Sequence, residues 1–243
     1  DLDPSTGFTV QAINAGTVVN KGVEIALGYT VVRNRDWRWQ LDGLFSRNRS
    51  MVSDIPENLS EIRTAGYTNL GTFAINGQPL GVIKGTAFQR ANNGQRLVGA
   101  NGWYLVDNKT SIIGNPNPDF KLTGISTLSY KAFSLRVQVD YTQGGDMYSA
   151  TSSVLLGRGV TRDTEFDRYL PIILPGVTDQ EGKVANNIQI SSTEAYFNNS
   201  LAGSAADEPG IFDATVVRIR EMSLAYNVPQ EVLDKLPFGA ISF

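Results

Sequence analysis

The sequence predicts an all-β fold, a segment of a transmembrane antiparallel β-barrel with long extracellular loops. Three observations lead to this expectation. Apolar and polar residues alternate over runs of about 11 residues, and no stretch shows convincing helical periodicity except for one possible turn at 230–236. Very short and very long connections also alternate along the chain. Together these features favour a barrel wall over a compact sheet protein.

Alternation of apolar and polar side chains defines five expected strands and the start of a sixth. Two short turns separate neighbouring strands, one at 34–36 and a tight one at 131–132. Period-two alternation places apolar side chains on one face of a sheet and polar side chains on the other. The expected strands are 23–31, 37–46, 120–130, 133–142 and 213–226, with the sixth beginning near Phe238.

The length of these runs is typical of strands that cross a bilayer, which need about 9–11 residues, whereas ordinary strands average about 5–6. A soluble sandwich would turn the polar face to water and bury the apolar one, and alternation alone leaves both arrangements open. For a barrel, we expect the lumen to be lined by Glu24, Arg38, Asp42, Lys121, Arg136, Gln138 and Asp140. The lipid would contact Val23, Ile25, Leu27, Val137 and Val139.

Loop lengths favour the barrel. The connections over about 49–119 and 144–212 are far longer than is usual within a compact domain. Outer-membrane barrels alternate short periplasmic turns with long extracellular loops in this way. We expect small hairpins at 81–88 and 95–106 within these loops. Two soluble β-domains with insertions are the alternative explanation.

Aromatic residues flank the short turns, as expected for belts at the two edges of a membrane. Strand ends in any sheet are also rich in aromatics, so the observation is not decisive. The residues concerned are Trp37, Trp39, Tyr130, Phe133, Tyr226 and Phe238. The apolar phase changes from odd positions at Val217 and Ile219 to even positions from Met222 onward, which predicts a β-bulge near Arg220.

Composition excludes most kinds of covalent chemistry. The chain of 243 residues has no cysteine and no histidine, which excludes thiol catalysis, Ser-His-Asp triads and the usual zinc sites. No carboxylate spacing marks a glycosidase. A net charge of −3 gives no attraction for nucleic acid. We therefore expect no catalytic residue, no metal site and no cofactor.

Ordered sequence elements resemble the SusC/RagA family of TonB-dependent outer-membrane transporters. The resemblance covers nearly the whole chain and is weakest in the two long loops. Residues 114–120 read GNPNPDF and lead into LSYKAFSL at 128–135. Residues 140–148 end in GGDMY, and 218–229 read RIREMSLAYNVP. A weaker match covers 14–24, before the first strand.

The resemblance implies that residues 1–243 belong to one C-terminal barrel domain of about 22 strands, with the plug domain and final strands absent. The intact protein would import glycans or peptides across the bacterial outer membrane of a Bacteroidota-like species. Its implied partners are a SusD-like surface lipoprotein, TonB through the missing N-terminal region, and outer-membrane lipid and lipopolysaccharide. A soluble secreted carbohydrate-binding protein and a passive porin are the alternatives.

Aromatic residues in the long loops are candidates for contact with cargo or with the lipoprotein lid. They could equally form small cores within the loops, which is the interpretation we favour. The residues are Trp103, Tyr104, Tyr169, Tyr196 and Phe197.

Overall fold

The computed structural model describes residues 14–67, 69–191, 206–229 and 234. The chain divides into two compact units. The strand unit consists of Lys21–Arg49, Pro116–Met147 and Phe212–Phe243. The loop unit consists of Asp1–Asn20, Ser50–Asn115 and Tyr148–Ile211. The predicted sixth strand at Phe238 and nearly all of the possible helical turn at 230–236 lie outside the described residues.

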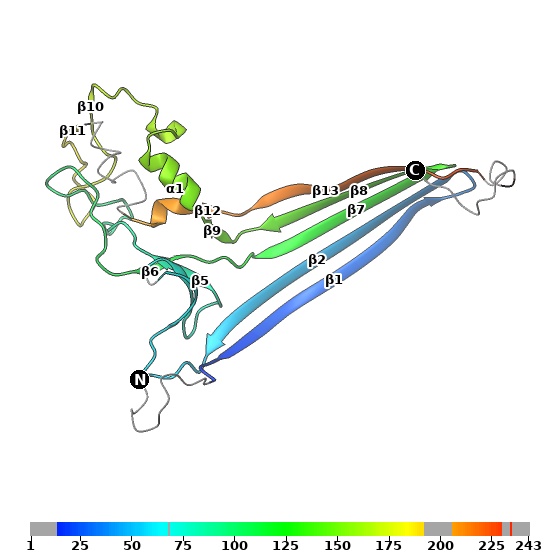
Figure 1. Ribbon diagram of the computed structural model, residues 1–243, viewed down its shortest axis with the longest axis horizontal. Coiled ribbons are helices and arrows are strands. Elements are labelled where there is room, and N and C mark those ends of the chain that lie inside the picture. The colour runs from blue at the N-terminus through cyan, green and yellow to red at the C-terminus, as the bar shows by residue number, and fades with distance from the viewer. Residues whose placement is uncertain (1–13, 68, 192–205, 230–233, 235–243) are drawn as a thin grey trace. The chain divides into compact units, whose positions relative to one another are not determined.

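The strand unit is built on a five-stranded sheet with the order β1-β2-β7-β8-β13 (Figure 1). Its strands are β1 (Thr17–Arg33), β2 (Trp37–Ser53), β7 (Phe120–Tyr130), β8 (Phe133–Gln143) and β13 (Val216–Tyr226). All five predicted strands are present, although the fifth begins at Val216 and not at Asp213. The first two are longer than predicted, at 17 residues each, because the strands continue past the point where the alternation becomes irregular. The pairs β2–β7, β7–β8 and β8–β13 are antiparallel.

Both predicted short turns are present and have clear local causes. The Asn34 side-chain oxygen accepts hydrogen bonds from the backbone N–H groups of Asp36 at 3.0 Å and Trp37 at 2.8 Å. Asparagine stabilises turns in this way. Lys131 adopts a positive φ of 51°, which allows Tyr130 and Phe133 to pair directly across a two-residue hairpin.

The predicted bulge near Arg220 is confirmed. The register between β13 and β8 shifts between Ile219 and Glu221, so Arg220 is the extra residue. Without it, the residues that follow would point to the wrong face, because a shift of one residue reverses the side of every side chain. The bulge lets Met222 pair with Val137 on the apolar side.

The loop unit contains secondary structure that the alternation did not predict. A four-stranded sheet runs β3-β4-β5-β6, and a two-stranded sheet joins β10 and β11. Their bounds are β3 (Ile62–Gly66), β4 (Gly71–Ala74), β5 (Val82–Gly85), β6 (Ser111–Gly114), β10 (Pro171–Ile172) and β11 (Ile190–Ser191). The remaining short elements are β9 (Asp146–Tyr148), β12 (Ile211–Asp213), η2 (Arg162–Thr164) and η3 (Glu208–Gly210).

Two expectations for the loops are wrong. Residues 81–88 do not form a hairpin, since β5 is a single strand between β4 and β6. The chain does contain a helix, α1 (Ala150–Gly157), capped by the Ser149 hydroxyl, which accepts a hydrogen bond from Ser152 N–H at 3.2 Å. It was missed because it is short and buries no residue, so it has no apolar period. No helix in the described ranges has the length and apolar character needed to cross a membrane.

The hairpin expected at 95–106 is present. Val98 and Tyr104 form an antiparallel bridge around a turn that is closed by a hydrogen bond from Gly102 N–H to the Gly99 carbonyl at 2.9 Å.

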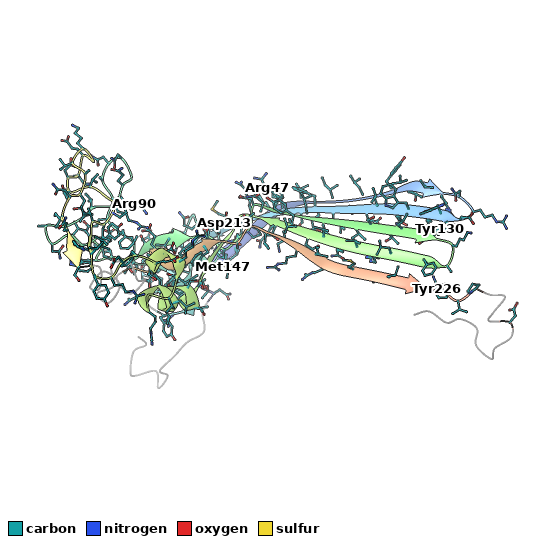
Figure 2. The ribbon with its side chains drawn as sticks, turned by 90° about the horizontal axis from the view of Figure 1, so that it is seen from above. Arg47, Arg90, Tyr130, Met147, Asp213 and Tyr226 are labelled. Carbon is teal, nitrogen blue, oxygen red and sulfur yellow. The ribbon has the colours of Figure 1, made fainter. Side chains whose placement is uncertain are left out.

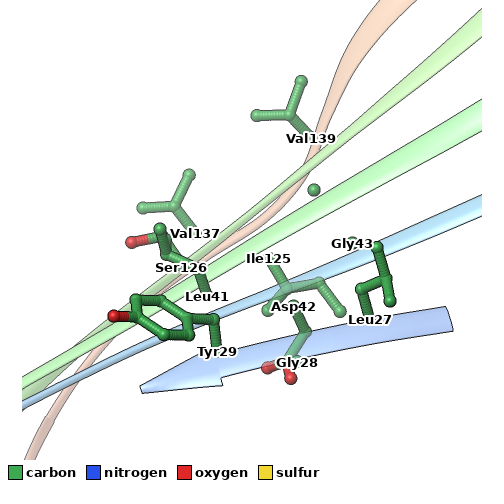
Figure 3. Close-up of a pocket in the computed structure, with 11 residues that line it drawn as sticks. Leu27, Gly28, Tyr29, Leu41, Asp42, Gly43, Ile125, Ser126, Val137 and Val139 are labelled. Atoms are coloured by element: carbon green, nitrogen blue, oxygen red, sulfur yellow. The ribbon is translucent and has the colours of Figure 1, made fainter. Parts of the chain in front are cut away.

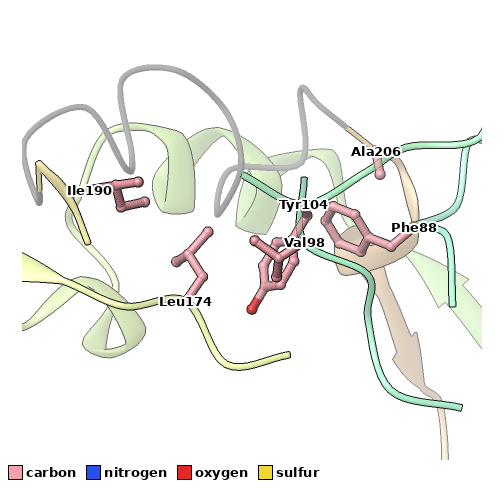
Figure 4. Close-up of a cluster of buried hydrophobic side chains, with 6 residues drawn as sticks. All are labelled: Phe88, Val98, Tyr104, Leu174, Ile190 and Ala206. Carbon is pink, nitrogen blue, oxygen red and sulfur yellow. The ribbon is translucent and has the colours of Figure 1, made fainter. Parts of the chain in front are cut away.

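The loop unit has its own apolar core (Figure 4). The Tyr104 hydroxyl donates to the Pro175 carbonyl at 2.9 Å, and its ring lies 5.0 Å from that of Phe88. The Arg96 guanidinium stacks over both rings, at 4.6 Å from Phe88 and 5.2 Å from Tyr104. The central cluster consists of Phe88, Val98, Tyr104, Leu174, Ile190 and Ala206. Side chains of the loop unit therefore stabilise one another around this cluster.

Candidate functional site: the two faces of the five-stranded sheet

The polar face of the sheet carries charged side chains from β2, β7, β8 and β13. The register pairs Gln40 with Thr127 and Thr127 with Arg136, so alternate residues of successive strands share this face. A Cβ added to Gly28 would lie 2.8 Å from the Asp42 carboxylate, which places the even positions of β1 on the same side. Leu44 and Ile125 interrupt this otherwise polar surface.

Asp140 is the centre of a hydrogen-bonded network on the polar face. One carboxylate oxygen accepts hydrogen bonds from the Thr123 hydroxyl at 3.0 Å and the Gln138 amide at 3.1 Å. The other oxygen lies 3.1 Å from Arg220 Nε. Three strands thus contribute to a single ionic cluster, which requires water or polar partners on its open side.

A second ion pair joins Arg136 Nε to Glu221 Oε2 at 3.2 Å. Beside it, a hollow of about 270 Å³ is lined by Arg38, Gln40, Asp42, Thr127, Ser129 and Arg136. Toward the loop end of the sheet, a larger hollow of about 600 Å³ is lined by residues that include Glu24, Ser46 and Lys121. All seven residues predicted to line a lumen share this face. That the face borders a lumen remains a prediction.

The opposite face of the sheet is apolar and uncovered within the strand unit. The exposed fractions are 72% for Leu27, 67% for Met222 and 69% for Leu224. A shallow hollow of about 520 Å³ lies near its centre (Figure 3). It is lined mainly by Leu27, Tyr29, Leu41, Gly43, Gly124, Ser126, Val137 and Val139. Gly43 and Gly124 pair directly, and a Cβ on either would meet nothing within 4 Å, so the two glycines form its floor.

Two rows of aromatic rings cross the apolar face. At the short-turn end, the rings of Trp37 and Tyr130 are 4.3 Å apart, and those of Phe133 and Tyr226 are 4.8 Å apart. These four belong to the belt predicted from the sequence. The belt residue Phe238 lies outside the described residues. Trp39 lies two residues along β2 from Trp37, and its indole N–H donates to the Ser126 hydroxyl at 3.1 Å.

The second aromatic row lies at the loop end and was missed in the sequence. Phe120 lies 5.9 Å from Phe45 and 5.9 Å from Tyr141. The signal that could have revealed it is the recurrence of an aromatic residue at the opposite end of three expected strands.

The spacing of the two rows fits a bilayer. Eight residue steps separate Trp37 from Phe45, and ten separate Phe120 from Tyr130. At about 3.4 Å per residue, these are distances of about 27 and 34 Å along the strands. Strands tilted by about 35–45° would reduce them to a band of about 20–28 Å, close to the apolar band of about 25 Å on outer-membrane barrels.

At the loop end, two of the sequence motifs pack against each other. Gly144 and Gly145 have positive φ values of 72° and 84°. A Cβ on Gly144 would lie 2.8 Å from the Asp119 carboxylate, and one on Gly145 would lie 3.1 Å from the Pro116 carbonyl. The NPNPD segment is therefore a strand-entry turn that requires these glycines.

Thr215 extends this structure at the start of β13. Its hydroxyl accepts a hydrogen bond from Gly144 N–H at 2.8 Å, and its N–H donates to Asp213 Oδ1 at 2.7 Å. Hydrogen bonds from the side chain and the backbone of Thr215 hold the pKa of the Asp213 carboxyl below its usual value.

The loop aromatics have different environments. Tyr104 is only 6% exposed, and Trp103 packs against the same core, as the loop-core interpretation expects. Burial raises the pKa of Tyr104, while the hydrogen bond and charge of Arg96 act in the opposite direction. Tyr169 is 97% exposed and is free to contact another molecule. Tyr196 and Phe197 lie outside the described residues.

Two curated proteins resemble the chain over almost its whole length. TonB-dependent receptor P26 of Formosa agariphila is 26% identical over 265 residues, covering 99% of this chain and 25% of that receptor. TonB-dependent receptor P3 of the same organism is 24% identical, covering 96% of this chain and 24% of the receptor. The predicted resemblance to TonB-dependent receptors is confirmed. The chain thus spans about a quarter of the length of the curated relatives that it matches. No protein-family profile matches it.

Solved structures of the RagAB peptide importer share the fold. Its closed-closed and open-open states each match with a TM-score of 0.59 and 17% identity, covering 99% of this chain and 26% of the matched one. At this identity, the likeness establishes the fold. The RagA resemblance expected from the motifs therefore extends to the path of the backbone.

Proposed function

We propose that the chain is a wall segment of a TonB-dependent outer-membrane importer of the SusC/RagA type. The apolar face of the five-stranded sheet contacts lipid, the polar face lines the transport lumen, and the loop unit lies on the extracellular side. The observation that supports this most strongly is the uncovered apolar face, bounded by aromatic rows at the spacing of a membrane.

A water-soluble alternative needs a second layer over the apolar face. Soluble monomers rarely expose contiguous apolar patches larger than a few hundred Å². Among the described residues, every apolar side chain that is buried belongs to the loop unit, and none covers the sheet from within the strand unit. Lipid removes the penalty of this exposure because hydrocarbon chains replace water against Leu27, Met222 and Leu224.

The polar face acts on cargo by binding and exchange and carries out no covalent step. The ion pairs Arg136–Glu221 and Arg220–Asp140 stay hydrated in this arrangement. They offer both hydrogen-bond donors and hydrogen-bond acceptors to a molecule in the lumen. Such a surface suits glycans and peptides alike. The transport energy would come from TonB acting on a plug domain encoded elsewhere in the intact protein.

Partners follow from the two edges of the sheet and from its loops. In the described sheet, β1 and β13 are the end strands, and an open edge with unpaired N–H and C=O groups is unstable in a membrane. We infer that neighbouring strands of the same polypeptide pair with them to close a barrel of about 22 strands, in which residues 1–243 form part of one domain. A SusD-like lipoprotein would contact the loop unit.

Sidedness can be tested by labelling because the chain contains no cysteine. In the full-length protein on intact cells, a membrane-impermeant maleimide should label Tyr169→Cys in the loop unit. It should label Arg35→Cys at the short turn only after the outer membrane is permeabilised. The reverse pattern would contradict the topology, and equal labelling of both sites on intact cells would contradict insertion in a membrane.

Import can be tested separately with cells that express or lack the intact protein. Uptake of labelled glycan and peptide pools should require the protein and should stop when an uncoupler removes the proton gradient. Uptake that persists with the uncoupler would support a passive porin in place of a TonB-driven importer.

A further inference from the structure

Two arginine side chains lean toward the same point on the polar face of the sheet. Arg38 Nη2 on β2 donates a hydrogen bond to Gln40 Oε1 at 3.2 Å. Arg136 Nη1 on β8 donates to Thr127 Oγ1 on β7 at 3.5 Å. Gln40 and Thr127 are direct cross-strand partners, and the Cβ atoms of such partners are about 5 Å apart. The two guanidinium groups therefore converge on one cross-strand pair, within the hollow of about 270 Å³ that all four residues line.

The hollow has an excess of positive charge at this point. Arg136 is paired with Glu221, whereas Arg38 makes no ion pair with a carboxylate of the described residues. Asp42 also lines the hollow, and its carboxylate accepts a hydrogen bond from the Gln40 amide N–H at 3.1 Å. This bond orients the amide so that its carbonyl faces Arg38. A ligand group with a single negative charge would neutralise the excess.

The charges and the size of the hollow favour a carboxylate over a phosphate. A planar guanidinium group forms paired hydrogen bonds with the oxygens of either anion. Asp42 on the same hollow repels a doubly charged phosphate more strongly than a singly charged carboxylate. A volume of about 270 Å³ is the liquid share of roughly nine water molecules, which is enough for one acidic sugar or amino-acid unit.

The hollow lies near the short-turn end of the sheet. Its lining residue Ser129 precedes Tyr130, which Figure 2 shows at the end of the sheet away from Arg47. In the proposed orientation, this is the periplasmic end of the lumen. Passage through a pore requires binding that is favourable enough for entry and weak enough for release. Solvent-exposed guanidinium groups provide such binding, and Arg38 is exposed, as is 40% of the Arg136 side chain.

We propose that Arg38, Arg136 and Thr127 form a subsite that binds a carboxylate group of the cargo. The guanidinium groups hold the carboxylate oxygens from two sides. The Thr127 hydroxyl accepts a hydrogen bond from Arg136 and donates its own proton to the ligand. The subsite favours cargo that carries a carboxylate, such as a uronic acid or a free peptide C-terminus, over neutral glycans. The proposal rests on the proposed function, because it requires the polar face to border the lumen.

The test measures carboxylate binding with a cysteine placed beside the subsite. Ser129→Cys is introduced into the full-length protein, in which any cysteine outside residues 1–243 is replaced, and its reaction with N-ethylmaleimide is followed in mild detergent. Ser129 lines the hollow, and its hydroxyl is already bonded to that of Ser134 at 3.0 Å. Propionate should slow the reaction, whereas propionamide, which is neutral and of similar size, should not. At constant ionic strength, the propionate concentration that halves the rate measures the affinity.

Variants of opposite sign test the charges. Arg38→Gln removes a charge-assisted hydrogen bond, so the half-protecting concentration of propionate should rise about tenfold. The matched control, Arg35→Gln, removes the same charge from the neighbouring turn, outside the hollow, and should leave this concentration unchanged. Asp42→Asn removes the repelling charge and keeps an oxygen for the Gln40 amide, so the concentration should fall about twofold.

Three results would overturn the subsite. The first is an equal effect of Arg38→Gln and Arg35→Gln. The second is stronger protection by inorganic phosphate than by propionate. The third is a failure of Ser129→Cys to react with the maleimide, which would show that another part of the polypeptide covers the hollow.

The proposed function can fail separately from the subsite. Each variant is therefore also expressed in cells, which are fractionated to establish insertion in the outer membrane. Absence of the full-length protein from that membrane would contradict the proposed function. Correct insertion, together with a propionate affinity that does not depend on Arg38, would contradict only the carboxylate subsite.

Discussion

The loop unit buries apolar side chains in a core of its own, whereas the strand unit leaves apolar side chains exposed on one face of its sheet. In the loop unit, Leu174 and Val98 are each 2% exposed, and the core around them resembles that of any small soluble domain. In the strand unit, Leu27, Ile219 and Leu224 keep between 68% and 72% of their surface exposed, on the end strands β1 and β13 of the described sheet.

The membrane orientation proposed above explains this difference as an adaptation of the two units to different solvents. In the sheets of both units, interior strands pair their backbone N–H and C=O groups with those of neighbouring strands. Backbone hydrogen bonding therefore does not distinguish the two units. In water, burial of apolar surface contributes about 25 cal/mol per Å² to the free energy of folding. The uncovered apolar face of the strand unit does not gain this stabilisation. In the proposed orientation, hydrocarbon chains of the membrane supply the missing contact.

The largest effect that separates the units should come from the core of the loop unit. Leu174→Ala removes a side chain that is 2% exposed and should raise the rate of amide exchange at Val98 by destabilising the core by about 2–5 kcal/mol. The matched control is Leu170→Ala, whose side chain is 60% exposed and should change stability by less than about 0.5 kcal/mol. Similar exchange in both variants would mean that this core is not a cooperative unit.

The strand unit should show a dependence on face instead of burial. Val137→Arg places a charge on the apolar face and should destabilise the full-length protein in lipid vesicles by about 2–4 kcal/mol. Gln138→Arg, one residue away on the polar face beside Asp140, should cost little. The measurement is urea unfolding in vesicles, and equal costs at the two positions would remove the assignment of faces.

A smaller effect should come from the backbone at the loop end. Gly144→Ala forces a side chain into a positive φ and against the Asp119 carboxylate, and should cost about 1–2 kcal/mol. Gly43→Ala is the control, since its new methyl group meets nothing within 4 Å. Thermal unfolding in lipid should separate the two, and a harmless Gly144→Ala would show that the NPNPD turn does not need this conformation.

The smallest effect should appear in the pH dependence of the loop unit. The Val184 N–H donates to Asp179 at 2.6 Å, and this bond together with those from other backbone N–H groups lowers the pKa of Asp179. A carboxyl group with a lowered folded-state pKa stabilises the fold above its unfolded pKa of about 3.9, and that contribution is lost as the pH falls through the folded value. Asp179→Asn should therefore reduce the loss of protease resistance in the 179–184 loop below that pH. An unchanged acid profile would show that Asp179 contributes nothing there.

The strand unit could be predicted closely from the sequence. Alternation located β7 and β8 to within a residue, and the change of phase after Ile219 located the bulge. These features are local, because the side of a strand residue depends only on its position in the run. The two glycines of GGDMY have positive φ values, which few other residues adopt.

The loop unit could not be predicted in the same way. Its core joins Phe88 and Tyr104 to Leu174, and a hydrogen bond links Thr86 N–H to Asp207 across 121 positions. Contacts at such separations leave no period in the sequence. The short strands β3 to β6 contain too few residues for alternation to be recognised, and α1 has no buried face. The proposed contacts of Tyr169 and the proposed cargo likewise depend on molecules that the sequence does not encode.

The central claim, that one face of the sheet contacts lipid and the other contacts water, is tested most directly by spin labelling along β8. The chain has no cysteine, so single cysteines can be introduced at each position from 135 to 141 in the full-length protein and labelled with a nitroxide. In vesicles, contact with oxygen should be highest at Leu135, Val137 and Val139, and contact with a water-soluble nickel chelate should be highest at Arg136, Gln138 and Asp140. A label at Tyr169 in the loop unit should contact the chelate freely. Loss of the alternation, or its reversal, would contradict the account.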